Sequence, residues 1–251
     1  MNASAAEQFN SVAQAYATSA VHAQGPDLPW LVTALEAVDT WSVLDVGTGA
    51  GHASLAVAPS VRQVTAIDIA DRMLATAARL ASERSIANVT FRQASVAELP
   101  FASGTFDGAF TRYSAHHWPN SAHSVGETAR VLRPGAPFVL IDTISPEDAA
   151  LGTYINALEL LRDPSHVQNP TLIKWQGDLE CAGFVVESVR KWQIDLVTLE
   201  WLRRAATIEW RAAACRHLLS EAPPAARAAF TIAGDGESFQ LPCALIKARR
   251  A

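Results

Sequence analysis

The hydrophobic pattern of this chain alternates between short apolar runs and longer segments with helical spacing. The apolar runs predict strands at residues 42–46, 63–67, 89–93, 106–112 and 137–142. Between them, helical patterns cover about residues 50–57, 71–84 and 120–132. Strands that alternate with helices in this way predict an α/β fold, with a mostly parallel sheet and helices on both faces.

The pattern changes on either side of this core. Residues 1–28 are Ala-rich and are expected to be helical until Pro26 and Pro29 interrupt them, and a further helix is expected over about residues 31–37. Beyond the core, the pattern predicts helices at 146–162 and 171–182, a long strand at 184–196, an apolar Ala-rich segment at 198–219 and a last strand at 238–247. We expect one domain made of N-terminal cap helices (1–40), a core (41–145) and a remaining part (146–251) that completes the sheet.

Composition narrows the class of protein. The chain has 251 residues, of which 49% are hydrophobic and 18% charged, as in a globular domain. No apolar run is long enough to span a membrane, and the N-terminus lacks the pattern of a signal peptide. Three widely spaced cysteines do not make a disulfide framework or a zinc site. We therefore expect a cytoplasmic protein without a metal, present as a monomer or homodimer.

The net charge of the chain indicates which class of partner it binds. The formal net charge is −5, whereas nucleic-acid-binding domains usually carry a basic surface. A small-molecule partner is therefore favoured over a nucleic acid.

The most informative stretch follows the first predicted strand. Residues 43–51 read VLDVGTGAG, so Asp45 precedes glycines at positions 47, 49 and 51. Glycine is needed where φ is positive or where a ligand approaches the backbone closely. A strand, a glycine turn and a helix form the opening of a nucleotide-binding α/β unit.

The spacing of these glycines argues against a dinucleotide. That fingerprint needs a third glycine at position 52, where this chain has His52. The pattern suits instead a ligand without phosphates, whose positive centre Asp45 would favour. Asp68 follows the second strand, where an acid is placed to accept both ribose hydroxyls.

Five motifs then occur in order along the chain: VLDVGTGAG at 43–51, AIDI at 66–69, ELPF at 98–101, FDGAF at 106–110 and ARVLRPG at 129–135. Together they resemble the class I S-adenosylmethionine-dependent methyltransferases, in the type 11 branch of small-molecule enzymes similar to the ubiquinone/menaquinone biosynthesis methyltransferases. The resemblance covers about residues 10–145, and LRDPSHV at 161–167 is similar to bacterial members of the same group. It implies a Rossmann-like sheet with an antiparallel edge and a C-terminal helical lid.

The resemblance also assigns a cofactor site. It implies that Gly47, Thr48, Gly49 and Gly51 line the methionine and ribose side of S-adenosylmethionine. It implies that Asp68 binds the ribose diol, and that S-adenosylhomocysteine is the product.

The remaining cofactor assignments are less specific. Asp45 is expected either to hold the methionyl amine, directly or through water, or to have a purely structural role. Ile69 and Met73 would flank the adenine, although Met73 also fits a simple core position. Where related sequences have an acid that accepts from the adenine amino group, this chain has Ser95, so the Ser95 hydroxyl and the Val96 N–H would hold the base.

The acceptor side is represented by the segment after the fourth strand. Ligands in open α/β sheets bind outside the carboxyl ends of the strands, so this segment faces the reaction. Main chain from Arg112 to Ser114 is expected at the methionine portion, and Tyr16 is expected to close over it. His117 is the first candidate for a general base or an orienting group and His116 the second, while a role for both as hydrogen-bonded loop histidines stays open.

Other side chains of this region have weaker assignments. Asp142, at the end of the fifth strand, is a candidate for orienting a substrate. Five tryptophans are candidates for the wall of an aromatic acceptor pocket, and one or two of them are expected there. They are Trp118, Trp175, Trp192, Trp201 and Trp210. The arginines of the 198–219 segment, Arg203, Arg204 and Arg211, are expected to form a solvated face of the lid rather than an anion site.

These observations predict an enzyme that transfers the methyl group of S-adenosylmethionine to an O, N or C atom of a small, cyclic or aromatic metabolite. Methylation of a protein or nucleic acid and non-catalytic binding of the cofactor remain alternatives. A nicotinamide-dependent oxidoreductase is disfavoured by His52.

Overall fold

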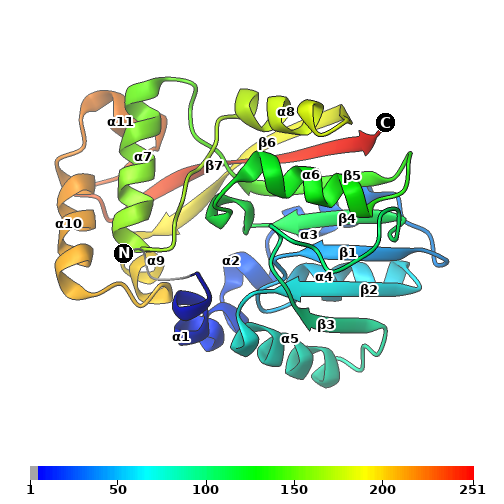
Figure 1. Cartoon of the computed structure of the whole chain (residues 1–251). Coiled ribbons are helices and arrows are strands. Elements are labelled where there is room, and N and C mark those ends of the chain that lie inside the picture. The colour runs from blue at the N-terminus through cyan, green and yellow to red at the C-terminus, as the bar shows by residue number, and fades with distance from the viewer. Residues whose placement is uncertain (1–4) are drawn as a thin grey trace.

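The computed structural model describes residues 5–251, and the side chains of Ala20 and Val21 are outside the description. Seven strands form one sheet in the order β3-β2-β1-β4-β5-β7-β6 (Figure 1). The five parallel strands are β1 (Ser42–Val46), β2 (Gln63–Asp68), β3 (Val89–Gln93), β4 (Gly108–Arg112) and β5 (Pro137–Thr143). The expected parallel core is confirmed, with strand ends that differ by at most two residues.

The two C-terminal strands complete the sheet. Strand β7 (Ser238–Arg250) runs antiparallel to β5 and to β6 (Phe184–Val197), which forms the edge. The antiparallel strand is therefore the second from the edge. Both strands are long and continue past the carboxyl end of β5, where Leu196, Phe239 and Leu241 join a separate apolar cluster.

Helices cover both faces of the sheet, as expected. One face carries α3 (Asp27–Leu35) and α4 (His52–Val57), and the other carries α6 (Ser121–Val131) and α8 (Leu172–Cys181), as Figure 1 shows. Helix α5 (Asp71–Glu83) packs beside β2 and β3. Strands β4 and β5, between these layers, are buried along their whole length, as in a parallel sheet covered on both sides.

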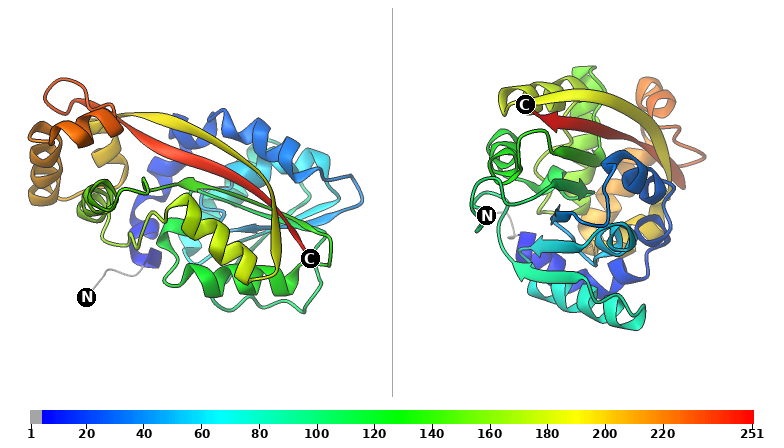
Figure 2. Two further views of the ribbon diagram at one scale, coloured as in Figure 1. Left: turned by 90° about the horizontal axis from the view of Figure 1, so that it is seen from above. Right: turned by 90° about the vertical axis from the view of Figure 1, so that its right-hand side faces the viewer.

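The C-terminal helices lie at the carboxyl end of the parallel strands (Figure 2). They comprise α7 (Ala149–Arg162), α9 (Thr198–Arg204), α10 (Glu209–Ser220) and α11 (Pro224–Ala229), and we call them the lid. The apolar segment at 198–219 forms two helices because the chain turns at Ala206, whose φ is +51°. The Thr207 hydroxyl donates to the Arg162 carbonyl oxygen at 2.9 Å and ties this turn to α7.

The N-terminal segment forms α1 (Ala5–Ala17), α2 (Ala20–Ala23) and α3. The expected break at Pro29 is wrong, because this proline lies in the first turn of α3, where a missing N–H costs no helical hydrogen bond. Helix α1 packs on α5 through Val12, Ala13 and Met73. Both α1 and the lid therefore lie near the end of the sheet where the glycine turn begins.

Candidate functional site

The glycine turn joins β1 to α4 through three glycines with positive φ: Gly47 (+78°), Gly49 (+52°) and Gly51 (+86°). A Cβ at Gly47 would lie 1.9 Å from the Ser114 Oγ, and a Cβ at Gly49 would meet no atom within 4 Å. A Cβ at Gly51 would lie 2.8 Å from the Ala77 Cβ of α5. Gly47 thus lets the turn approach the loop after β4, whereas Gly51 lets α4 approach α5.

Asp45 lies beneath this turn with a fully buried side chain. Its Oδ2 accepts hydrogen bonds from the Thr48 Oγ1 at 2.7 Å and the Ser54 Oγ at 2.6 Å. Its Oδ1 has no partner among the described residues. Burial raises the pKa of Asp45 to about 6, against the opposing effect of the two hydroxyls. A buried carboxylate oxygen without a partner is costly, so this site suits a cationic ligand group.

Asp68 connects the glycine turn to the end of β2. Its Oδ2 accepts from the Gly49 N–H at 2.8 Å, and its Oδ1 accepts from the Ala70 N–H at 2.9 Å. Burial raises the pKa of this carboxyl group, while the backbone donors oppose the shift. Both oxygens are held in fixed positions at the rim of the cavities described next.

Three neighbouring cavities open at this end of the sheet. The glycine-loop cavity lies over Asp45 and Gly49. The outer cavity extends past Asp68 to the loop after β3. The lid cavity lies between α1 and the lid. Phe9 and His117 line all three, so the cavities meet at these two rings.

The candidate cofactor residues gather around the first two cavities. Those lining the glycine-loop cavity are Tyr16, Asp45, Gly47, Thr48, Gly49, Asp68, Met73, Arg112 and Ser114. Those lining the outer cavity include Ile69, Ser95 and Val96. Gly51 is the exception, because it lines none of the three cavities and serves the packing of α4 on α5.

Arg112 has a structural role besides its place in the cavity wall. Its guanidinium forms a buried ion pair with Asp27 and donates to the His22 carbonyl oxygen at 2.8 Å. These contacts attach α2 and α3 to the end of β4. The arginine side chain is thus committed to holding the N-terminal helices beside the glycine turn.

The two candidate catalytic histidines differ in their surroundings. His116 follows β4 in a short 3₁₀ turn (Ala115–His117), and its Nδ1 lies 2.6 Å from the Oδ1 of Asp142 at the end of β5. The Oδ2 of Asp142 accepts from the backbone N–H of His116 at 3.0 Å. Burial lowers the pKa of His116, but the charge and hydrogen bond of Asp142, together with the charges of Glu159 and Asp163, outweigh this effect, so the pKa is raised. His116 lines the lid cavity.

His117 is a weaker base than its neighbour. Its Nδ1 lies 3.2 Å from both the carbonyl oxygen and the Oγ of Ser165, and its ring meets Phe9 edge-on with centroids 4.8 Å apart. Burial and the nearby His116 lower the pKa of His117 to about 3. A third histidine, His166, lies 5.8 Å from His116 between ring centroids, and burial lowers its pKa to about 2.

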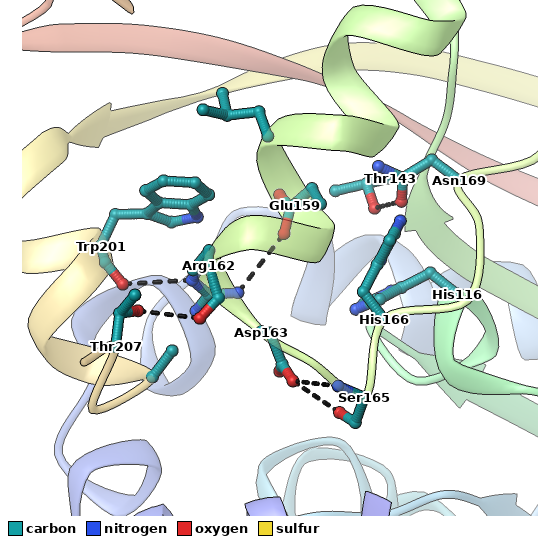
Figure 3. Close-up of polar contacts among 12 residues, drawn as sticks. His116, Thr143, Glu159, Arg162, Asp163, Ser165, His166, Asn169, Trp201 and Thr207 are labelled. Atoms are coloured by element: carbon teal, nitrogen blue, oxygen red, sulfur yellow. Dashed lines mark hydrogen bonds and ion pairs between the residues drawn. The ribbon is translucent and has the colours of Figure 1, made fainter. Parts of the chain in front are cut away.

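The polar side of the lid cavity comes from α7 and α9 (Figure 3). Arg162 donates to the Trp201 carbonyl oxygen at 3.2 Å and pairs with Glu159 at 3.5 Å. Arg204 also lines this cavity, which makes the expectation of a purely solvated face wrong for this residue. Arg203 is exposed, as expected, and Arg211 donates to the Leu160 carbonyl oxygen at 3.0 Å.

The sequence analysis missed several lining residues. Phe9 and Glu159 come from α1 and α7, and no local motif marks them. Arg162 lies in the motif at 161–167 and Tyr113 in the expected main-chain segment at 112–114, but neither side chain was expected to line a cavity. Tyr113 carries one signal that only the backbone reveals, a φ of +52° at a bulky residue. Of the tryptophans, Trp118 lines the outer cavity and Trp201 the lid cavity.

Two negative findings concern the described part of the chain. Residues 5–251 contain no helix long and apolar enough to cross a membrane. Among the same residues, no three His, Cys, Asp or Glu side chains are grouped so that they could hold a metal ion.

Comparison with known proteins identifies the family. A family model for a methyltransferase domain matches residues 44–140. The uncharacterized methyltransferase YcgJ of Bacillus subtilis is 34% identical over 243 residues, which are 95% of this chain and 96% of YcgJ. Its crystal structure superposes with a TM-score of 0.86 over 89% of this chain and 97% of that chain.

Two further relatives extend the comparison. The structure of BH2331 from Bacillus halodurans C-125 is 30% identical, with a TM-score of 0.86 over 90% of this chain and 99% of that chain. The demethylmenaquinone methyltransferase of Porphyromonas gingivalis is 29% identical over 146 residues, which are 55% of this chain and 60% of that enzyme. Because the first relative matches over almost its whole length, this chain is an enzyme that belongs to the class I S-adenosylmethionine-dependent methyltransferases of the type 11 branch.

Proposed function

We propose that this enzyme binds S-adenosylmethionine across the glycine-loop and outer cavities and methylates a small cyclic or aromatic molecule in the lid cavity. The observation that carries the proposal is the meeting of the three cavities at His117 and Phe9. It gives a cofactor and an acceptor separate sites with a common boundary.

The residues of the first two cavities fit the cofactor. The Oδ1 of Asp45 suits the methionyl ammonium, because it is buried and accepts from no donor of the described residues. Asp68 suits the ribose diol, since its two oxygens are fixed by backbone N–H groups at the rim of both cavities. Ile69, Ser95 and Val96 suit the adenine, as the apolar and hydroxyl-bearing wall of the outer cavity.

The cofactor supplies an electrophilic methyl group on a sulfonium. The protein's part is to align the acceptor with that methyl group and to exclude water, which can lower the barrier by about 7–11 kcal/mol. Phe9, Tyr16 and His117 form the boundary between the glycine-loop and lid cavities and would provide this alignment.

His116 is the better-placed proton acceptor of the two histidines. Asp142 holds its Nδ1, which leaves Nε2 as the atom available toward the lid cavity. Asp142 also raises the pKa of His116 despite its burial, whereas His117 has a pKa of about 3. An acceptor hydroxyl or amine would therefore transfer its proton to His116 as the bond to the methyl group forms.

Two experiments test this function. Calorimetry with S-adenosylhomocysteine and NAD should show binding of the first and none of the second; the reverse result would overturn the cofactor assignment. Transfer of tritiated methyl groups should then occur to members of a panel of quinols, catechols and heteroaromatic amines, and not to tRNA. Binding without transfer to any panel member would favour a non-catalytic cofactor-binding protein, and transfer to tRNA alone would favour the nucleic-acid alternative.

A further inference from the structure

The lid cavity contains an arginine without a counter-ion. Arg204 is the last residue of α9, and its side chain is part of the cavity wall. Its Nε is buried and has no hydrogen-bond partner in the described part of the chain, and no carboxylate of residues 5–251 forms an ion pair with it. Glu159 and Glu200 are the acids whose charge acts on Arg204, and neither is within ion-pair distance.

Its neighbour Arg162 is in the opposite situation. Arg162 donates to the Trp201 carbonyl oxygen, lies 3.5 Å from Glu159 and lies 3.5 Å from the Tyr16 hydroxyl. Its guanidinium also stacks on the Trp201 ring at 5.0 Å, and Figure 3 shows it between Trp201 and Glu159. Within residues 5–251, Glu159 is the one carboxylate that lines the cavity, and it is therefore already paired.

Among the groups that line the cavity, the charges leave an excess of one positive charge. Glu159 balances Arg162, and Arg204 is left over. His116 is neutral when it acts as a proton acceptor, and its partner Asp142 does not line the cavity. His22 and His117 have pKa values lowered by burial, so they are neutral near pH 7. Asp163 does not line the cavity, and its Oδ1 accepts from the Ser165 backbone N–H and Oγ. Arg204 is half-buried, its buried Nε has no partner among the described residues, and desolvation lowers its pKa, so an anion would relieve the cost.

Part of the wall is apolar. Ile194 and Leu196 of β6, Leu241 of β7 and Trp201 of α9 line the same cavity as Arg204. The wall therefore matches a molecule with an apolar ring and one negative group.

We propose that the methyl acceptor carries a single carboxylate and that Arg204 binds it, an inference that rests on the proposed transfer to an acceptor in the lid cavity. A guanidinium binds a carboxylate through two parallel N–H···O hydrogen bonds. A phosphate is disfavoured because its second charge would have no counter-ion and would face Glu159. The carboxylate fixes one end of the acceptor at α9 and leaves the other end toward His116 and the junction with the cofactor.

The test uses pairs of ligands that differ only in this charge. Calorimetry on protein saturated with S-adenosylhomocysteine compares benzoate with benzamide, indole-3-acetate with indole-3-acetamide, and cinnamate with cinnamamide. At least one carboxylate should bind about tenfold or more tightly than its amide, as expected for charge-assisted hydrogen bonds. Equal affinities within all three pairs would overturn the proposal, and so would tighter binding of phenyl phosphate than of benzoate.

Variants locate the effect. Arg204→Gln should remove the preference for the carboxylate and leave the amide affinity unchanged, and Arg204→Lys should restore part of it. The matched control is Arg203→Gln, which removes an exposed arginine one residue earlier on the same helix and should keep the full preference. A preference that survives in Arg204→Gln would refute the assignment.

A third measurement separates the two proposals. Affinity for S-adenosylhomocysteine is measured on each variant without a second ligand. If the wild-type protein does not bind S-adenosylhomocysteine, the proposed function is contradicted. If it binds S-adenosylhomocysteine but shows no preference for carboxylates, only this inference is contradicted. Unchanged thermal stability of Arg204→Gln would exclude loss of the α9 terminus as the cause of a changed preference.

Discussion

The Nδ1 of His116 lies 2.6 Å from the Oδ1 of Asp142, and this contact joins the turn after β4 to the end of β5. Asp142 is fully buried, and its Oδ1 also accepts from the Thr143 N–H at 2.8 Å. The carboxylate is thus fixed on the sheet and fixes in turn the ring orientation of His116. Such a pair presents the opposite ring nitrogen to the cavity in a defined direction.

Replacing His116 with glutamine should lower turnover by about 10²- to 10⁴-fold for an acceptor that must lose a proton, because the proton acceptor is removed. Affinity for S-adenosylhomocysteine should not change, since His116 does not line the glycine-loop cavity. The matched control is His123→Gln, which alters an exposed histidine on α6. Initial rates and calorimetry would check both expectations, and wild-type turnover in His116→Gln would remove the proposed role.

The pair also predicts a pH dependence. His116 must be neutral to accept a proton, so turnover should fall as the pH drops through its raised pKa. Asp142→Asn removes the charge that raises this pKa, so the acidic limb of the kcat/KM profile should move to lower pH. A limb that does not move in Asp142→Asn would mean that another group titrates there.

Asp68→Ala should weaken binding of S-adenosylhomocysteine by about 100-fold or more, because two hydrogen bonds from hydroxyls to a charged acceptor are lost at about 1.5–3 kcal/mol each. Asp71→Ala is the control, since Asp71 is exposed three residues later in the first turn of α5. Calorimetric titration measures both. Near-native affinity in Asp68→Ala would show that the end of β2 does not bind the ribose.

Asp45 should make cofactor binding sensitive to acid. Its pKa is about 6 in the free protein, and an ammonium partner would lower it, so binding releases a proton below this pH. Affinity for S-adenosylhomocysteine should therefore decrease below about pH 6, and the decrease should approach about tenfold for each pH unit. The Asp45→Asn variant should bind S-adenosylhomocysteine more weakly near neutral pH, and its affinity should not change with pH in this range. A wild-type affinity that stays constant down to about pH 5 would assign Asp45 a purely structural role.

Gly51→Ala should destabilise the fold by about 2–5 kcal/mol, from a strained positive φ and a clash with Ala77. The contrasting variant is Gly126→Ala on α6, where a Cβ meets nothing within 4 Å, and it should stabilise the protein by about 0.5–1 kcal/mol. Urea denaturation would measure both. Equal stability of the two variants would show that α4 can shift away from α5 at little cost.

Much of the fold, and the residues proposed to bind the cofactor, follow from the sequence because their signals are local. Short apolar runs between helical segments predict the parallel strands. The spacing of the glycines after Asp45 indicates a turn whose backbone adopts positive φ. The end of β2 then falls at Asp68 without further information. The local sequence gave Pro29 the wrong role, because a proline can either end a helix or lie in its first turn, as it does here.

Only the tertiary structure decided which residues share a cavity. Phe9 of α1, Glu159 and Arg162 of α7, and Arg204 of α9 lie far apart along the chain, and no spacing rule links them. Arg203 and Arg204 are adjacent and chemically identical, yet one is exposed and the other lines the cavity, because neighbouring helical residues point about 100° apart. Likewise, two adjacent histidines became distinct when the end of β5 brought Asp142 to one of them. The sequence by itself determined the strands, the glycine turn and the family; long-range packing determined the partners, and with them the charge of each group in the site.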